Sequence, residues 1–291
     1  LIMRGKKILI TGPNGALGSS LLEYSDCKNV HGFDVDITHR SEVRERLLIE
    51  KPDVIIHTAA YTDVEKSETN PDKAYKVNTI GTLNLISYCL DKDVLFVYIS
   101  STGVYGENKS VNTYNEFDIA NPTTIHHKSK YEGENIVKNH LNRYLILRTG
   151  WLFGGKRTHN KNFVYNRYLE ASGSDVMYSD TSQIGNPTYI NNLIKQMYVL
   201  IEEDQYGTFN CVDRADNISR YEYVKKIVEL FDIKCKIKAS KDSDRFKRVA
   251  PVSKNESAVN YKLNLLGLNI MEDWDKSLYR YVEWLKGNIN G

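Results

Sequence analysis

Three glycines spaced three residues apart follow a short apolar run near the start of the chain. Gly12, Gly15 and Gly18 stand between the run at 7–11 and a segment whose leucines have helical spacing. In a strand, turn and helix of this kind, the first glycine permits the turn, the second lets backbone approach a pyrophosphate, and the third lets the helix lie close to the strand. The helix N-terminus then offers free N–H groups to the phosphates. The sequence therefore predicts a dinucleotide site formed by Gly12, Asn14, Gly15, Ala16, Leu17 and Gly18.

The next two apolar runs supply further candidate contacts to this cofactor. The run at 30–33 ends in Asp34, and an acid at that point can accept hydrogen bonds from the adenine ribose hydroxyls, which favours NAD over NADP. A solvated loop acid is the alternative interpretation of Asp34. The segment Asp36-Ile37-Thr38 follows at once. The run at 54–57 leads into Ala59, Ala60 and Tyr61, where small side chains leave room for a ribose and phosphates.

A cluster of hydroxyl side chains follows the next apolar run, at 94–99. Ser100, Ser101 and Thr102 come directly after it. Ligands of an open parallel sheet lie beyond the carboxyl ends of its strands, so this cluster is expected where substrate binds.

Strand and helix patterns alternate from residue 7 to residue 148, which predicts an α/β fold with a doubly wound parallel sheet of the Rossmann type. The expected helices include one at 41–50 capped by Ser41 and a long one that begins at Asn70-Pro71. A fifth strand is expected at 144–148, and 207–211 is a candidate for the last strand of the sheet. We therefore predict a dinucleotide-binding domain at 3–152, which also takes in about 188–212. A smaller, interleaved and mainly C-terminal substrate-binding lobe is predicted at 153–291, with a loop at 183–188 and helices at 219–231, capped by Ser219, and at 274–286.

Composition narrows the class of protein. The chain has 291 residues, long enough for this fold, and its 39 Lys+Arg nearly balance its 37 Asp+Glu, so no nucleic-acid partner is expected. Four cysteines, Cys27, Cys89, Cys211 and Cys235, lack metal or redox spacing, which predicts free thiols and no metal site. No apolar run approaches the ~20 residues of a membrane span, and we expect a cytoplasmic protein.

Several segments together resemble the extended short-chain dehydrogenase/reductases, and within them the dTDP-4-dehydrorhamnose reductases most closely. The resemblance covers nearly the whole chain. It is carried by residues 11–18, 36–38, 52–56, 59–62, 74–78, 147–151 and 185–188, which read TGPNGALG, DIT, PDVII, AAYT, AYKVN, LRTGW and GNPT.

The resemblance implies a set of catalytic residues. In such enzymes a Ser or Thr at the end of the fourth strand binds the substrate carbonyl, a Tyr protonates it as NAD(P)H delivers hydride, and a Lys four residues later orients the ribose. The matching hydroxyl is Ser101 and the matching lysine is Lys130. His126 stands at the position of the Tyr.

This departure changes the expected acid chemistry. A phenol of pKa ~10 beside an ammonium group is a usable proton donor, whereas an imidazole of pKa ~6.5 is pushed lower by the same neighbour and becomes mostly neutral. Three interpretations of His126 are open. It replaces the tyrosine as an acid that works at low pH, or it marks a chain that has lost efficient catalysis, or water or another side chain supplies the proton instead. His127 and Tyr131 are expected to point elsewhere.

The resemblance also implies a sugar nucleotide between the lobes, held by Ser101, Thr102, Trp151, Gln183 and Pro187. Trp151 is equally open to a core role. Asn78, counted among the cofactor contacts with Lys130, either pins backbone or belongs to a water relay, and Arg148 contacts a phosphate or an internal acid.

The predicted activity is NAD(P)H-dependent reduction of a nucleotide-linked 4-keto-6-deoxy sugar, with NADP(H) or NAD(H) as cofactor and a homodimer as a further expected assembly. The alternative is a regulatory protein that binds cofactor without turnover, because the chain also resembles the non-catalytic β subunit of methionine adenosyltransferase.

Overall fold

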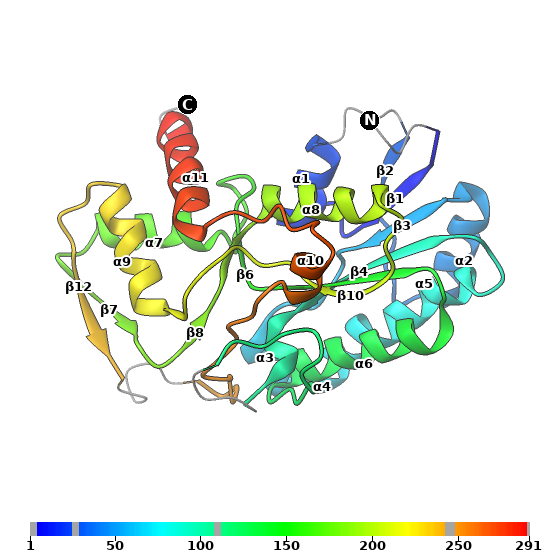
Figure 1. The fold of residues 1–291 in the computed structure, drawn as a ribbon, viewed down its shortest axis with the longest axis horizontal. Helices are drawn as coiled ribbons and strands as arrows, with labels where there is room; N and C mark the ends of the chain where they lie inside the picture. Colours follow the sequence, from blue (N-terminus) through cyan, green and yellow to red (C-terminus); the bar gives the residue numbers. More distant parts are fainter. Residues whose placement is uncertain (1–4, 25–28, 108–111, 242–247, 290–291) are drawn as a thin grey trace.

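The computed structural model describes residues 5–24, 29–107, 112–241 and 248–289. These residues form a parallel sheet of six strands in the order β10-β5-β4-β3-β1-β2, with helices on both faces (Figure 1). The predicted doubly wound α/β fold is confirmed, including the strand near residue 207 at the edge of the sheet. The strands are β1 (Ile8–Thr11), β2 (Val30–Phe33), β3 (Val54–His57), β4 (Leu95–Ser101), β5 (Tyr144–Thr149) and β10 (Gly207–Asn210).

Each face of the sheet has its own apolar core. Alternate side chains of a strand point to opposite faces, so Ile8 and Ile10 pack on one side and Leu9 on the other. The first face is covered by α1 (Ala16–Tyr24) and α8 (Ile190–Glu202), with α10 (Tyr261–Leu265) beside them. The second face is covered by α2 (Arg40–Glu50), α5 (Gly81–Cys89) and α6 (Ile125–His140). Burial on both faces explains why the strands are apolar runs without alternation.

The long helix expected from Asn70 is confirmed as one unbroken helical run from 71 to 89 that contains a π-helical turn. Asn70 does cap α4 (Pro71–Tyr75), because its side chain accepts a hydrogen bond from the backbone N–H of Lys73 at 3.2 Å. A π-helical turn, η1 (Lys76–Ile80), then leads into α5, and a short helix, α3 (Val64–Thr69), precedes the whole segment. The Ser41 cap was wrong, since α2 begins at Arg40 and His39 at its N-cap makes no side-chain hydrogen bond.

The remaining elements form the second lobe, seen at the left of Figure 1. Its helices pack their aromatic and aliphatic side chains into a separate core with Trp151 and Phe153. The expected helices near 163, 219 and 274 are present, and Ser219 forms a capping box with Glu222. The elements are β6 (Trp151–Phe153), α7 (Phe163–Ser172), β7 (Val176–Asp180), β8 (Ile184–Gly185), β9 (Pro187–Tyr189), β11 (Ile218–Ser219), α9 (Arg220–Leu230), β12 (Lys236–Ser240) and α11 (Trp274–Ile289).

The segment predicted as a loop at 183–188 contains the short strands β8 and β9. They pair with β11 and β6, which are distant in sequence, so tertiary contacts create them and no local pattern announces them. The 3₁₀ turn η2 (Thr102–Tyr105) follows β4.

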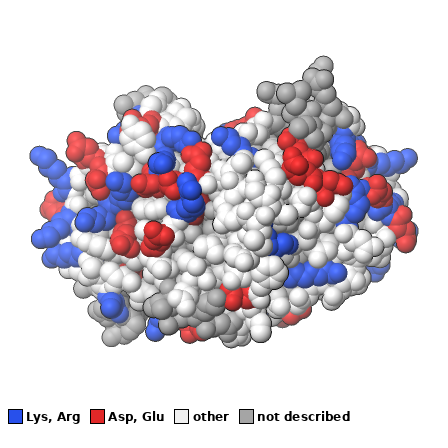
Figure 2. Space-filling model, viewed as in Figure 1, with Lys and Arg blue, Asp and Glu red and all other residues white. Residues whose placement is uncertain are grey.

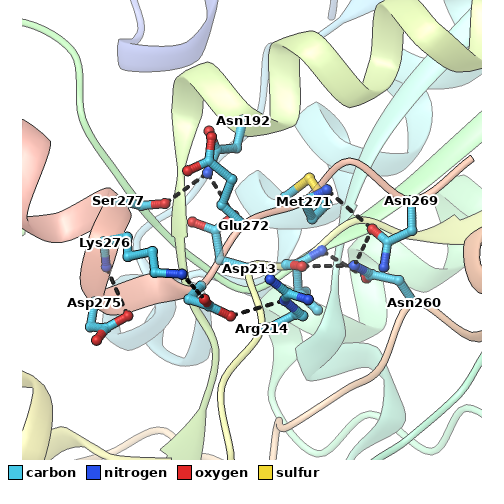
Figure 3. A network of polar contacts seen from close by, with 12 residues as sticks. Asn192, Asp213, Arg214, Asn260, Asn269, Met271, Glu272, Asp275, Lys276 and Ser277 are labelled. Atoms are coloured by element: carbon cyan, nitrogen blue, oxygen red, sulfur yellow. Dashed lines mark hydrogen bonds and ion pairs between the residues drawn. The ribbon is translucent and has the colours of Figure 1, made fainter.

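A buried polar network fastens the C-terminal helix to the rest of the molecule (Figure 3). The side-chain amide of Asn192 on α8 donates to Asp213 Oδ1 at 2.9 Å and to Ser277 Oγ of α11 at 2.8 Å. Asp213 Oδ2 accepts from the backbone N–H of Tyr189 at 3.0 Å, and burial raises the pKa of Asp213 to about 6. The C-terminal helix α11 is thus anchored to α8, a helix that covers one face of the sheet.

Positive and negative side chains are interspersed on the face shown in Figure 2. Cys89, Cys211 and Cys235 are free and buried, while Cys27 lies outside the described residues. Within the described ranges, no helix is both long and apolar enough for a bilayer, and no metal-binding group of three His, Cys, Asp or Glu side chains is found.

One buried ion pair ties α6 to the sheet. Arg148 of β5 donates to both carboxylate oxygens of Glu134, at 2.9 and 2.7 Å, and the Glu134 side chain is fully buried. Ser100 Oγ and Lys138 Nζ also donate to this carboxylate, at 2.6 and 2.9 Å. Arg148 therefore contacts an internal acid, which decides between the two interpretations of it.

Substituting Arg148→Met should destabilise the fold by about 3 kcal/mol, because it leaves the Glu134 charge buried with fewer partners. Urea unfolding measures this free energy. The control is Arg46→Met, which removes an exposed arginine that pairs with Glu50 and should cost less than about 1 kcal/mol. Equal losses of unfolding free energy in the two variants would show that the buried pair stabilises the fold no more than the surface pair does.

Candidate functional site

A cavity of about 830 Å³ lies along the carboxyl ends of the sheet strands and reaches the second lobe. It brings together most of the residues predicted from the sequence. Lining it are Gly12, Asn14, Gly15, Ala16, Leu17, Gly18, Asp34, Asp36, Ile37, Ala59, Ala60, Ser101, His126, Lys130 and Trp151.

Six other predicted ligand residues are not part of this lining. They are Thr38, Tyr61, Asn78, Thr102, Gln183 and Pro187. Thr102 is buried in η2, Gln183 Nε2 donates to the Ser253 carbonyl at 3.4 Å, and Pro187 pairs with Trp151 between strands. Direct contact of these six residues with a ligand stays a prediction.

The glycine loop has the geometry that its spacing predicts. Gly12 has φ +65°, and a Cβ there would lie 2.9 Å from the backbone of Ala59. A Cβ on Gly18 would lie 2.2 Å from the Gly12 carbonyl oxygen, so the close approach of α1 to β1 requires this glycine. A Cβ on Gly15 would meet only that same oxygen, at an ordinary 3.4 Å. The fold does not need a glycine at 15, whereas a pyrophosphate at the start of α1 would, so the cradle fits a dinucleotide.

Two acids line the adenosine end of this cradle. Asp36 Oδ1 accepts a hydrogen bond from the Thr38 backbone N–H at 2.9 Å, and this bond lowers the pKa of Asp36. Its carboxylate is thereby engaged in the turn at 36–38. Asp34 lines the same cavity, and its contact with a ribose stays a prediction.

Asn78 pins the backbone beside the site. Its Oδ1 accepts from the Tyr61 N–H at 2.8 Å, and its Nδ2 donates to the Tyr61 carbonyl at 3.2 Å and to Ser129 Oγ at 2.9 Å. These contacts support the pinning interpretation of Asn78. They also hold in place the Tyr61 carbonyl that faces His126.

The ring of His126 is held in one tautomer by that carbonyl. His126 Nδ1 lies 2.9 Å from the Tyr61 carbonyl oxygen. Because a carbonyl oxygen only accepts, Nδ1 carries the proton of the neutral ring and Nε2 carries a lone pair. Burial is the largest cause that lowers the pKa of His126 well below its usual value, and His127 and Lys130 lower it further. The expected direction of the shift is confirmed, although burial outweighs the lysine.

His127 contacts the predicted substrate hydroxyl, contrary to the expectation that it points elsewhere. Its Nε2 lies 3.4 Å from Ser101 Oγ, and its Nδ1 lies 3.0 Å from Thr124 Oγ1 at the N-cap of α6. The ring packs directly against Gly103, where a Cβ would overlap it. Burial lowers the pKa of His127 to about 4, so this ring is neutral and fixes the Ser101 side chain.

Lys130 is the buried cation of the site. Its Nζ lies 3.9 Å from the centre of the Tyr98 ring, and no carboxylate within the described residues forms an ion pair with it. Burial lowers the pKa of Lys130 to about 7, with Glu134 opposing the shift. The ammonium group therefore gives up its proton more readily than an ordinary lysine does.

Trp151 forms the wall between the cavity and the second lobe. The indole is 9% exposed, its N–H donates to Glu256 Oε2 at 2.8 Å, and the Arg220 guanidinium lies 3.5 Å from its ring centre. Trp151 is thus a core residue of the second lobe that also lines the cavity, so its two interpretations are compatible.

Residues 159–161 close part of the cavity, and nothing in the sequence predicted this. His159, Asn160 and Lys161 line it, and His159 Nε2 lies 3.1 Å from Ser19 Oγ of α1. Lys161 Nζ donates to Thr62 Oγ1 at 2.8 Å. Thr149 also lines the cavity, and its buried hydroxyl has no hydrogen-bond partner among the described residues. The only sequence signal for Thr149 was the motif at 147–151 that contains it, and no signal existed for 159–161.

The fold, the glycine cradle and the cluster of Ser101, His126 and Lys130 define a dehydrogenase/reductase of the extended short-chain type. The chain belongs to the family of the RmlD substrate binding domain, whose pattern matches residues 6–286. The resemblance predicted from the sequence is confirmed, and with it the oxidoreductase class.

Named relatives agree with this membership. A dTDP-4-dehydrorhamnose reductase of Aggregatibacter actinomycetemcomitans is 31% identical over 216 residues, which are 70% of this chain and 72% of that protein. The crystal structure of such a reductase from Clostridium acetobutylicum superposes with a TM-score of 0.90 at 34% identity, covering 96% of this chain and 99% of that one. The enzyme of the same name from Bacillus anthracis, solved in complex with NADP, gives a TM-score of 0.89 at 32% identity over 95% and 98% of the two chains.

Two alanine substitutions separate the roles of the loop glycines. Gly15→Ala should leave the free energy of unfolding nearly unchanged but weaken binding of NADPH and NADH at least tenfold, because only a ligand needs the space of its methyl group. Gly18→Ala should destabilise the protein itself, by about 1–3 kcal/mol, because its methyl group overlaps the Gly12 carbonyl. Chemical denaturation and coenzyme fluorescence titration measure the two effects. Unchanged coenzyme affinity in a folded Gly15→Ala protein would exclude the cradle as the pyrophosphate site.

Proposed function

We propose that the chain reduces the keto group of a nucleotide-linked 4-keto-6-deoxy sugar, such as dTDP-4-keto-L-rhamnose, with NADPH or NADH. The observation that carries this proposal is a single cavity whose lining joins the glycine cradle to Ser101, His126 and Lys130 and ends at the second lobe. Relatives at 31 to 34% identity bear the name dTDP-4-dehydrorhamnose reductase, and one of them holds NADP. Under this proposal residues 3–152, with about 188–212, hold the dinucleotide, and 153–291 complete the sugar-nucleotide site.

The residues of the chain divide the work of this reaction. A reduced nicotinamide bound in the cavity would supply a hydride for the carbonyl carbon. The Ser101 hydroxyl accepts from the Gly103 N–H at 3.1 Å and lies 3.4 Å from His127 Nε2, so its own proton is free to bind the carbonyl oxygen. Gly12, Gly15 and Gly18 hold the pyrophosphate, Asp34 holds the adenosine ribose, and Lys130 orients the nicotinamide ribose. The indole of Trp151 borders the sugar.

One observation favours a second function. His126 replaces the expected phenol, and its neutral tautomer offers no proton at Nε2. A protein that binds coenzyme and a partner protein without turnover, like the β subunit of methionine adenosyltransferase, would need no proton donor at all. The homodimer and the cytoplasmic location stay predictions under either function.

The proposal predicts turnover by the natural sequence and faster turnover by His126→Tyr, since a phenol restores a proton donor at this position. Coenzyme oxidation with dTDP-4-keto-L-rhamnose measures the rates, and coenzyme titration serves as the control for binding. Turnover that is present only in the Tyr variant, with equal coenzyme affinity in both proteins, would favour the non-catalytic function. Absence of turnover in both proteins would exclude this substrate class.

A further inference from the structure

The reduction proposed above needs a proton for the substrate oxygen, and the histidines of the site do not supply it. In neutral His126 the only ring proton is on Nδ1 and is directed at the Tyr61 carbonyl oxygen, 2.9 Å away. Loss of that proton would leave an imidazolate, which is a far stronger base than the site requires. His126 therefore offers the cavity an acceptor.

His127 and Ser101 form a positioning pair. Thr124 Oγ1 accepts from the backbone N–H of His127 at 3.2 Å, which leaves its hydroxyl proton for Nδ1 of the ring. The ring proton is then on Nε2, toward Ser101 Oγ. The His127 ring is absent from the cavity lining, so it orients Ser101. An aliphatic hydroxyl such as that of Ser101 can bind the developing oxyanion but is too weak an acid to protonate it.

Lys130 has the arrangement that a proton donor needs. It lines the cavity together with Ser101 and is 5% exposed. The nearest carboxylate, Glu134, is already bound by Arg148, Lys138 and Ser100, so Lys130 has no ion pair to break when it releases a proton. Its ammonium group lies over the Tyr98 ring, whose hydroxyl donates to the Lys130 backbone carbonyl at 3.1 Å and so holds the helix against β4.

The charged and titratable groups around this ammonium come from four elements. On its own helix α6 they are His126, His127 and Glu134; the others are His57 of β3, Tyr98 of β4 and Arg148 of β5. His57 is neutral, because burial lowers its pKa well below the usual value. Of these groups only Glu134 is an anion, and Arg148 neutralises it.

We propose that Lys130 is the general acid of this chain and that its ammonium group protonates the keto oxygen in place of the missing phenol. As the carbonyl carbon is reduced, one N–H bond of the ammonium breaks and an O–H bond forms on the substrate. Lys130 is left as a neutral amine and regains a proton from solvent after the product leaves. The pKa of about 7 that burial gives this lysine matches the task, since an acid works best when its pKa is near the working pH.

The proposal rests on the proposed reductase function, and its test begins with a measurement that needs no turnover. Isotope labelling of lysine side chains, with Lys130→Arg to assign the signal, reports the titration of Lys130 in the intact protein. We expect a midpoint near pH 7. A Lys130 that remains protonated beyond pH 9 would overturn the proposal, whether or not the protein is a reductase.

Turnover gives the second measurement. For the natural sequence, kcat/KM should be constant at acid pH and fall about tenfold per pH unit above the Lys130 midpoint, since only the protonated amine is active. His126→Gln keeps a side chain at this position but removes its titration, and the alkaline fall should remain at the same pH. If the fall disappears in His126→Gln, or begins well below pH 6 in the natural sequence, the acid is His126 and the proposal is wrong.

Lys130→Arg keeps the positive charge and the N–H donors but cannot release a proton near neutral pH. We expect kcat to fall by about 10²–10⁴-fold while coenzyme affinity, from fluorescence titration, changes only a few-fold. His126→Tyr in the Lys130→Arg background should recover part of the lost kcat, because the phenol again supplies a proton. A Lys130→Arg protein that binds coenzyme and keeps its kcat would overturn the proposal. Absence of turnover in both the natural protein and His126→Tyr would instead mark the failure of the reductase function, and the Lys130 titration would still decide the lysine's acidity.

Discussion

The cost of burying charge on one face of helix α6 governs the site. Lys130 and Glu134 are one helical turn apart on this face, and both are almost completely buried. A buried charge requires partners, and Glu134 has three: Arg148 in a bidentate pair, Lys138 and Ser100. These partners keep its pKa below the usual value despite burial. Lys130 has an aromatic face instead of a carboxylate, so the same dry environment makes its proton easy to lose. One helix face thus holds a permanent anion that fastens the fold and a labile cation that faces the cavity.

The parts of this structure that sequence could predict are those set by local chemistry. The runs at 7–11, 54–57 and 144–148 are strands within a residue or so, because strands buried on both faces must be apolar throughout. Gly12 and Gly18 are demanded by backbone contacts that recur wherever a helix follows a strand so closely. Ser219 with Glu222 forms a capping box that the sequence spells out.

What sequence could not predict depends on contacts between distant residues. The segment at 183–188 is strand only because β11 and β6 lie beside it, and β12 forms only on β7. His127 was expected to point elsewhere because helical spacing gives the direction of a side chain but not the position of the Gly103 backbone that receives it. The tautomer of His126 depends on a carbonyl 65 residues away, held there by Asn78, and no spacing rule contains that information.

A histidine at 126 affects the acid chemistry of the neighbouring Lys130 as well as that of position 126 itself. A phenol beside a lysine is stabilised as phenolate by the ammonium, and the phenolate in turn stabilises the ammonium, so the phenol carries the acid role. With an imidazole in its place no such anion forms, because the Nδ1 proton is committed to the Tyr61 carbonyl. Around Lys130 there are then Arg148, the Glu134 that it compensates and otherwise neutral groups, and burial lowers the pKa of Lys130 to about 7. Under the proposal for Lys130, a histidine at 126 does not by itself remove acid catalysis, because the adjacent amine takes over the role.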